Sequence, residues 1–264
     1  MQMQPTDSQV SDIARVLRDF CGAGPVRAAH WAMVDAPQVQ AGCNEHQLMP
    51  VASVAKVPAL MAVYDRIVSG QLDPSARKPG RSFGATRYCS VLKTFDADAT
   101  LSLRETARLA LITSDNPLAV YLMSLVSEAD IAATLRQAGV SAQSVVRVGF
   151  SEAELGPPNR ANVMTVADVS RVLTAAVTNP AYDDIRVGLE NNLRNNRIPR
   201  LLPDEAIIAH KTGTLAGVVN DTGVISIGDT RFALSFLTDG QKDGGTTEDA
   251  IARCAAEVFK IVTA

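Results

Sequence analysis

The chain has little excess charge of either sign and no long apolar run. Its 25 lysine and arginine residues are nearly balanced by 28 aspartate and glutamate residues, so the formal net charge of the 264 residues is only −3. No basic patch or polybasic segment points to nucleic acid or to an anionic lipid surface. No apolar stretch approaches the roughly 20 residues of a membrane-spanning helix. A small molecule is the partner that this composition fits best, and we expect a monomer.

Cysteine and histidine are also scarce. The four cysteines show neither C-x-x-C spacing nor the density of a disulfide scaffold, so we expect buried free thiols. The three histidines lack metal-ligand spacing such as H-E-x-x-H, and we expect neither a metal nor a cofactor. Met1 to Arg15 has no basic start and no apolar stretch of a signal peptide. The chain as written is expected in the cytoplasm, or in the periplasm or outside the cell if a native leader was removed.

Three short motifs follow one another along the chain. They are Ser53-Val54-Ala55-Lys56, Ser114-Asp115-Asn116 and Lys211-Thr212-Gly213. The Ser-x-x-Lys pattern also occurs at Ser75 and at Ser90, but only Ser53 is followed by a long apolar helical pattern that would bury its helix. Together the three motifs indicate a serine acyl-transfer site that needs no histidine.

The spacing of the first motif suits that chemistry. A serine hydroxyl is a poor nucleophile until a base takes its proton, and residues three apart on a helix have Cβ atoms about 5–6 Å apart. Lys56 can therefore reach Ser53. The positive end of the helix dipole disfavours a protonated lysine nearby, so a neutral Lys56 can accept the proton. Pro58 falls about one turn inside this helix, and we expect a distorted first turn there.

Strands are expected at both ends of the chain and helices in the middle. The N-terminal part has a helical pattern over Ser8–Cys21 and two strand-like segments. After Pro203, three short β-branched segments are typical of an antiparallel meander, and a closing helix follows at Glu248–Val262; the three segments are Ala206–Lys211, Thr222–Ile227 and Arg231–Leu237. We therefore expect an α+β fold in which both ends build one antiparallel sheet, flanked by terminal helices, with an inserted all-helical lobe. Residues 1–264 form a single unit, with a sheet lobe of about 1–48 plus 190–264 and a helical lobe of about 49–189.

The motif order and this arrangement resemble the class A serine β-lactamases and related penicillin-recognising enzymes. The stretches at Thr100–Arg104, Asn196–Pro203 and His210–Gly223 are also similar to that family, so the resemblance covers nearly the whole chain. It implies a β-lactamase/transpeptidase-like fold and a β-lactam or related cyclic amide or ester as substrate.

The resemblance also implies roles for individual residues. Ser53 would be the nucleophile, Lys56 its proton acceptor, and Ser114 the shuttle that gives a proton to the departing nitrogen. Asn116 would bind the substrate's side-chain amide. The remaining substrate-binding residues implied are Lys211, Thr212, Gly213 and Thr214. Of these, Lys211 and Thr212 would meet the substrate carboxylate, and the N–H groups of Ser53 and Thr214 would form the oxyanion pocket.

Class A enzymes also use a carboxylate to activate the water that releases the acyl-enzyme. The segment from Glu152 to Gly156 is similar to that glutamate segment, which implies Glu152 as the catalytic base. Gly156 replaces the family's usual asparagine, although some active members carry glycine, and Phe150 replaces its usual arginine. The loop before Thr165 is also a few residues short. A looser loop would leave acylation faster than hydrolysis.

Other interpretations of the same residues stay open. Ser114-Asp115-Asn116 can simply cap a helix that begins at Pro117, Lys211-Thr212-Gly213 can be a strand end with a glycine bulge, and Glu152 can be a solvated charge. A nucleophile elbow around Ser151 is disfavoured because the following Gly-Pro-Pro prevents the helix that it requires. The rival functions are an esterase, amidase or D,D-peptidase on the same scaffold, and a lactam sensor that stays acylated.

Overall fold

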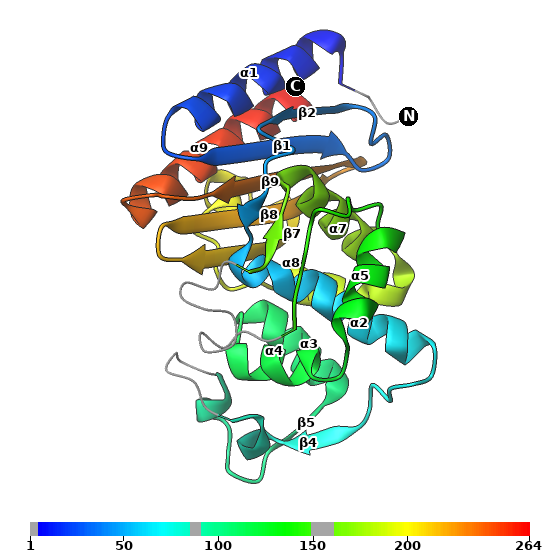
Figure 1. Cartoon of the computed structure of the whole chain (residues 1–264). Coiled ribbons are helices and arrows are strands. Elements are labelled where there is room, and N and C mark those ends of the chain that lie inside the picture. Colours follow the sequence, from blue (N-terminus) through cyan, green and yellow to red (C-terminus); the bar gives the residue numbers. More distant parts are fainter. Residues whose placement is uncertain (1–4, 85–90, 149–160) are drawn as a thin grey trace.

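The molecule is built in three layers. A computed structural model describes residues 5–84, 91–148 and 161–264 of the chain. An antiparallel five-stranded sheet, in the order β2-β1-β9-β8-β7, forms the middle layer. The terminal helices α1 (Asp7–Gly22) and α9 (Gly244–Thr263) cover one face, and the other helices gather on the opposite side (Figure 1). The predicted α+β fold, with a sheet from both chain ends and an inserted helical region, is confirmed.

The sheet joins segments from the two ends of the sequence. Its strands are β1 (Arg27–Met33), β2 (Gln40–Cys43), β7 (Ile207–Leu215), β8 (Val218–Ile227) and β9 (Thr230–Thr238). β1 pairs with β9 along its whole length, from Arg27 opposite Thr238 to Met33 opposite Phe232. The predicted C-terminal meander is confirmed, but β7 runs four residues beyond its predicted end at Lys211.

The length of β7 decides whether the Lys-Thr-Gly motif is a strand end with a glycine bulge. Lys211, Thr212 and Gly213 lie opposite Thr222, Asp221 and Asn220 in an unbroken register with β8. The motif therefore lies inside a paired strand, and its interpretation as a strand end with a glycine bulge is wrong. The sequence placed the end too early because Thr-Gly-Thr-Leu-Ala-Gly is rich in turn-forming residues, whereas pairing to β8 keeps this stretch extended.

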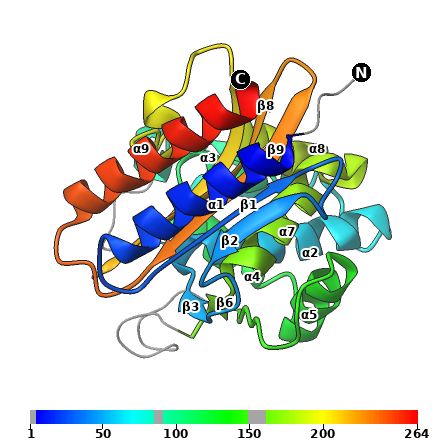
Figure 2. The same ribbon diagram turned by 90° about the horizontal axis from the view of Figure 1, so that it is seen from above.

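Alternate side chains of the sheet belong to two different cores. Phe232, Leu234 and Phe236 of β9 pack under α1 and α9, whereas Ala233 and Leu237 of the same strand face the helical region. This period of two is the geometry of a strand buried on both faces. In Figure 2 α1 and α9 run side by side across the sheet. The only tryptophan, Trp31, is fully buried beneath them.

The helical region surrounds one buried helix. Its helices are α2 (Lys56–Val68), α3 (Leu103–Ile112), α4 (Asn116–Met123), α5 (Glu128–Gln137), α7 (Val166–Thr178) and α8 (Asp183–Glu190). Every residue of α2 from Lys56 to Tyr64 is buried, so this helix has no solvent face over that stretch. Two short ladders complete the region, β3 (Met49–Pro50) with β6 (Val163–Met164) and β4 (Arg77–Pro79) with β5 (Thr100–Ser102). The boundaries of the two lobes stay a prediction.

Within the described residues, no single helix is long and apolar enough to cross a bilayer. Only α4 and α5 taken together reach the required length and composition, and a 92° bend separates them.

Candidate active site

Ser53 lies in a single 3-10 turn, Ala52–Ala55 (η1), and the α-helix behind it begins only at Lys56. Pro58 is then the third residue of α2, a position whose backbone N–H has no partner within a helix. The distorted first turn expected from Pro58 is therefore confirmed, and the proline costs α2 no hydrogen bond.

The backbone just before Ser53 is held on both sides. The carbonyl of Pro50 accepts a hydrogen bond from Asn220 Nδ2 at 2.8 Å, and the N–H of Val51 donates to the carbonyl of Asn162 at 3.0 Å. Between these contacts and Ser53, Ala52 has φ = +51°, a left-handed conformation that a residue with a Cβ seldom adopts. Backbone strain of this kind persists only where the surroundings impose it, and it gathers at functional sites.

Gly213 lies directly against the same turn. A Cβ at this position would be 2.5 Å from the carbonyl oxygen of Val51, 3.1 Å from Ala52 Cβ and 3.3 Å from Val54 Cγ2. Only glycine allows so close an approach. The Lys-Thr-Gly strand and the Ser53 turn are thus in van der Waals contact, although about 160 residues separate them in the sequence.

The Ser-Asp-Asn motif forms the sharp connection between α3 and α4. Ser114 has φ = +60°, and Asp115 caps α4 by accepting a hydrogen bond from the N–H of Leu118 at 3.2 Å. The second carboxylate oxygen of Asp115 accepts from the N–H of Val91 at 2.9 Å, so this buried side chain also ties down another segment. The predicted capping role is confirmed, and it belongs to Asp115, which leaves Ser114 and Asn116 for other contacts.

Lys56 reaches both of those residues. Its Nζ lies 2.6 Å from the carbonyl oxygen of Ser114, 2.7 Å from Asn116 Oδ1 and 3.3 Å from Ser114 Oγ. Complete burial lowers the pKa of the amine well below its ordinary value, and the charge of Lys211 lowers it further, whereas Asp115 acts in the opposite direction. A neutral amine donates two hydrogen bonds and offers one lone pair. Lys56 can therefore donate to the two carbonyl-type oxygens and accept a proton from a hydroxyl.

Lys211 approaches Ser114 from the sheet. Its Nζ lies 3.0 Å from Ser114 Oγ and 3.0 Å from the carbonyl oxygen of Thr212. Burial, reinforced by the charges of Arg194 and Arg197, lowers its pKa to about 7, while Asp221 raises it. The three motifs thus converge at one place. Lys56 of the first motif and Lys211 of the third both lie within hydrogen-bonding distance of Ser114 Oγ in the second. Gly213 holds the strand against the Ser53 turn.

A buried polar network supports β7 from behind. Arg197, which is 4% exposed, donates to the carbonyls of Gly213 and Asn220 at 3.2 and 2.5 Å and to Thr214 Oγ1 at 2.7 Å. Its charge is balanced by Glu248 at 3.0 Å. Sequence reasoning missed Arg197 as a positioning residue. The available signal was a charged residue beside an apolar segment, but its partners are distant in the sequence.

His210 belongs to the same network. Its Nδ1 lies 2.9 Å from Asp221 Oδ1 and its Nε2 lies 3.1 Å from Asn195 Oδ1, and the ring is buried within β7. Asp221 also accepts from the N–H of Ile198 at 3.0 Å. The prediction that His210 packs beside the Lys-Thr-Gly strand is confirmed.

The structure places the other predicted residues as follows. Thr212 is buried in β7, whereas Thr214 is exposed with its hydroxyl held by Arg197. Glu152, like Phe150 and Gly156, lies outside the described residues, so its predicted role stays a prediction.

The competing Ser-x-x-Lys at Ser75 has no such surroundings. Ser75 is exposed and hydrogen-bonds only to Asp73 of its own loop among the described residues, and Lys78 lies over the rings of Phe83 and Tyr121. The third such pattern begins at Ser90, outside the described residues. Within the described ranges, no group of three or more histidine, cysteine, aspartate or glutamate residues could hold a metal ion.

Known proteins share this architecture. A family model described as the beta-lactamase enzyme family matches residues 10–262. A β-lactamase structure from Sphaerobacter thermophilus has a TM-score of 0.82 and 22% identity, covering 96% of this chain and 97% of that one. A class A β-lactamase representative from Bacteroides cellulosilyticus has a TM-score of 0.84 and 20% identity, with coverages of 96% and 98%. A PBP-A mutant, seen as an acyl-enzyme complex with penicillin G, has a TM-score of 0.78 and 18% identity, with coverages of 97% and 97%. No curated protein matches the chain.

Proposed function

Because the chain belongs to the beta-lactamase enzyme family, we propose that it is a serine hydrolase that opens a β-lactam amide through an acyl-enzyme on Ser53. One observation carries the proposal. Ser114 Oγ lies within hydrogen-bonding distance of two buried lysine amines, Lys56 and Lys211, beside the strand that Gly213 holds against the Ser53 turn. A hydroxyl held between two amines of lowered pKa is suited to proton transfer.

Acylation begins with a proton leaving Ser53. Neutral Lys56 accepts it as Ser53 Oγ attacks the lactam carbonyl, which forms the ester bond and an oxyanion. The N–H groups of Ser53 and Thr214 stabilise that oxyanion, an interaction whose loss costs about 2.7–4 kcal/mol in comparable sites. The lactam C–N bond then breaks, and the departing nitrogen receives a proton from Ser114. Ser114 recovers one from protonated Lys56, 3.3 Å away, so the lysine returns to its neutral form.

Binding of the substrate falls to the residues around this path. Protonated Lys211 and the hydroxyl of Thr212 attract the substrate carboxylate, and Asn116 binds its side-chain amide. Asn116 Oδ1 also accepts from Lys56 at 2.7 Å, so the amide plane is held in place before the substrate arrives. A group that is held in place beforehand costs no reorganisation at the moment of reaction.

Release of the product needs a second proton acceptor. Glu152 takes a proton from a water molecule, whose oxygen attacks the acyl-Ser53 ester. The ester bond breaks, and the proton that Glu152 took from the water passes to Ser53 Oγ, which restores both groups. Support for this step comes from the resemblance of the Glu152 segment and not from described geometry.

Intact-mass spectrometry after exposure to benzylpenicillin tests the proposal. Wild-type protein should turn the compound over, with an adduct of the penicillin mass visible only within the first turnovers. Ser53→Ala should show no adduct at any time, and Glu152→Gln should accumulate it. Normal turnover by Glu152→Gln would refute the assigned base, and an adduct on Ser53→Ala would refute the nucleophile.

Two other outcomes would favour the rival functions. A persistent adduct on the wild-type protein would indicate a lactam sensor that acylates without turnover, in keeping with Gly156 and Phe150 in the glutamate segment. No adduct, together with cleavage of a p-nitrophenyl ester or of a D-alanyl-D-alanine peptide, would indicate an esterase, amidase or D,D-peptidase that uses the same residues.

A further inference from the structure

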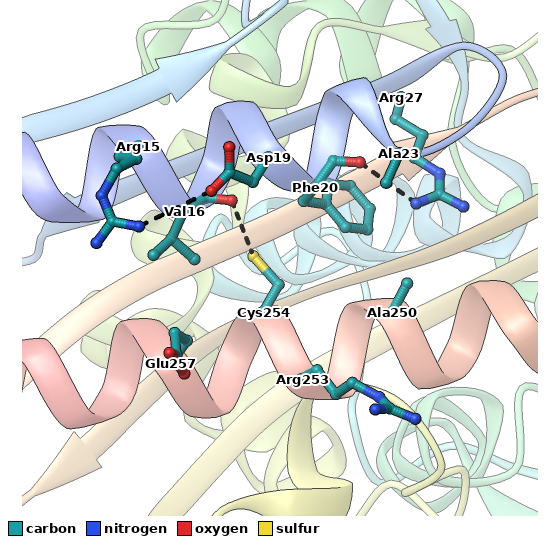
Figure 3. Close-up of a pocket in the computed structure, with 10 residues that line it drawn as sticks. All are labelled: Arg15, Val16, Asp19, Phe20, Ala23, Arg27, Ala250, Arg253, Cys254 and Glu257. Carbon is teal, nitrogen blue, oxygen red and sulfur yellow. Dashed lines mark hydrogen bonds and ion pairs between the residues drawn. The ribbon is translucent and has the colours of Figure 1, made fainter.

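A groove separates α1 from α9 on the face of the sheet opposite α2 (Figures 1 and 3). Its volume is about 280 Å³, which corresponds to roughly nine molecules of liquid water. The apolar part of its lining consists of Val16, Phe20, Ala23, Ala250 and Cys254. We call it the α1–α9 groove. None of the residues assigned to the candidate active site contributes to it.

One end of the α1–α9 groove holds a buried arginine. Arg27 is 5% exposed, and its guanidinium carbon lies 5.0 Å from the centre of the Phe20 ring. Its Nε donates to Gln241 Oε1 at 3.2 Å and its Nη1 to the carbonyl of Phe20 at 3.3 Å. Gly24 leaves room for it, because a Cβ there would be 2.5 Å from Arg27 Cζ. The position is therefore shaped around the guanidinium.

In the described part of the chain no carboxylate forms an ion pair with Arg27. Its Nη2 donates no hydrogen bond there, and this atom stays open to the groove, since it is not among the atoms that are both buried and unpaired. Burial lowers its pKa from the ordinary value, as expected for a cation that has left water. An anion that reaches this end of the groove can therefore accept a charge-assisted hydrogen bond from Nη2.

A second arginine lies at the same end. Arg253 of α9 lines the groove, and Figure 3 shows its side chain extending along α9 away from Glu257, at the same end as Arg27 but on the side of α9 away from α1. Asp249, one turn earlier on α9, pairs with Arg200 instead. At the other end Arg15 and Asp19 lie 3.9 Å apart and offset each other's charge. Glu257 also lines that other end, so the α1–α9 groove is positive where Arg27 and Arg253 lie, carries a net negative charge at the Arg15 end and is apolar between them.

We propose that the α1–α9 groove binds a small amphipathic carboxylate, such as a short phenylalkanoate, by its carboxylate at Arg27 and Arg253. The planar guanidinium of Arg27 offers Nη2 to a carboxylate oxygen, and the flexible side chain of Arg253 closes over the second oxygen. The apolar body of the ligand lies between the helices against Phe20 and Cys254. The volume limits the ligand to about nine to twelve non-hydrogen atoms. This site is independent of the proposed hydrolase activity.

Isothermal titration calorimetry with 3-phenylpropanoate tests the proposal, with the neutral 3-phenylpropan-1-ol as the comparison. The acid should bind the wild-type protein with a Kd of about 1 mM or tighter and raise its melting temperature progressively as the acid concentration exceeds Kd. The alcohol, which has the same apolar body but no charge, should bind at least about tenfold more weakly. Absence of acid binding up to about 10 mM, or equal affinity for both compounds, would overturn the proposal.

Substitutions inside and outside the α1–α9 groove test where the acid binds. Arg253→Gln should weaken binding of the acid about fivefold to tenfold, whereas Arg18→Gln should leave it unchanged. Arg18 is a matched control, since it is exposed on α1, outside the groove. Ala250→Leu, which fills the apolar part and keeps both arginines, should reduce binding of the acid by at least about fivefold.

Two results with these variants would contradict the proposal. Equal affinities of Arg253→Gln and Arg18→Gln would place the acid elsewhere. A concentration-dependent dimer that Arg253→Gln dissociates would mean that a second copy of the chain occupies the groove, which would also overturn the proposal. Light scattering without added ligand distinguishes this case.

Discussion

Lys56 and Lys211 meet at a single oxygen atom: their amines lie 3.3 and 3.0 Å from Ser114 Oγ. The two amines come from different layers of the molecule, one from α2 and one from β7, and both are completely buried. Because each positive charge disfavours the other, the protonated form of Lys56 is the more costly one next to a charged Lys211. In the proposed mechanism the Ser114 hydroxyl accepts from Lys211, and it accepts from Lys56 once that amine has taken the proton of Ser53, which directs the proton toward the departing nitrogen.

The charge of Lys211 predicts a pH profile. Its pKa of about 7 means that the free protein loses this positive charge as the pH rises through neutrality. If Lys211 attracts the substrate carboxylate, kcat/KM for a chromogenic cephalosporin should fall above about pH 7, approaching tenfold per pH unit. Lys211→Arg keeps its charge, so its lower activity should stay level to pH 9. A wild-type profile that is flat between pH 7 and 9 would contradict the role of Lys211.

The lowered pKa of Lys211 also predicts that the free energy of unfolding rises with pH above neutrality. The pKa of Lys211 falls from 10.5 in an unfolded chain to about 7 in the folded protein, so the unfolded state binds more protons between these values. Its contribution to the free energy of unfolding is therefore favourable above pH 10.5, is lost progressively as the pH falls toward 7, and is constant below that. Urea denaturation at pH 7 and pH 9.5 should show that Lys211→Met gains less stability than the wild-type protein over this interval. Parallel pH curves for the two proteins would refute the shift.

The contact between Gly213 and the Ser53 turn predicts the effect of a single methyl group. In Gly213→Ala the new Cβ would meet the carbonyl oxygen of Val51 at 2.5 Å, so β7 or the turn must move. We expect a loss of about 1–3 kcal/mol in the free energy of unfolding, and Ser53 acylation slowed at least tenfold. Gly22→Ala is the matched control, because nothing lies within 4 Å of its new Cβ. Unchanged acylation in Gly213→Ala, measured by stopped flow, would show that the approach is not required.

Asp168 holds the segment from Ser141 to Ser144, which precedes the glutamate loop. This carboxylate is 1% exposed and accepts hydrogen bonds from the hydroxyls of Ser141 and Ser144 at 2.5 and 2.7 Å. Burial acts to raise its pKa, but these hydrogen bonds leave the pKa below its ordinary value. Asp168→Asn should lower the free energy of unfolding by about 1.5–3 kcal/mol at pH 7.

Acid denaturation provides the check on Asp168. A carboxylate with a lowered pKa stabilises the fold above its unfolded pKa of 3.8, and the contribution is lost as the pH falls through the folded value. The difference between wild-type protein and Asp168→Asn should therefore shrink below about pH 4. Asp12→Asn is the comparison, because it removes an exposed carboxylate that pairs with Arg15. This substitution should lower the free energy of unfolding by less than about 0.5 kcal/mol. A pH-independent difference for Asp168→Asn would contradict the assigned cause.

Local patterns were sufficient for much of the fold. The helix expected at Ser8–Cys21 is present as Asp7–Gly22, because its apolar spacing and the Thr6–Gln9 capping box act on the same residues. The helix α8 was not predicted, since it is only eight residues long and Gly188 interrupts its pattern. Gly188 is explained by packing: a Cβ there would be 3.0 Å from Leu111 Cβ of α3. Contacts of this kind have no local signal.

In the candidate site, too, some features have a local sequence signal and others depend on residues that are distant in the sequence. The three motifs predicted that Lys56, Ser114, Asn116 and Lys211 come together, because their residue types carry the chemistry directly. The contact predicted between Lys56 and the Ser53 hydroxyl stays a prediction. The sequence did not predict the supports: Arg197 pairs with Glu248, 51 residues away, and Asn220 holds Pro50, 170 residues away. These partners are chosen by the packing of β7 and β8 against the helical region. Periodicity cannot identify them.

The pairing of β1 with β9 has a consequence for how the molecule is made. During synthesis β1 leaves the ribosome some two hundred residues before β9, its neighbour in the sheet, and α2 with Lys56 leaves about 150 residues before β7. Topologies dominated by such distant pairings fold slowly and expose apolar surface meanwhile. Ser53, the proposed nucleophile, can thus be joined by Lys211 only after synthesis has passed β7.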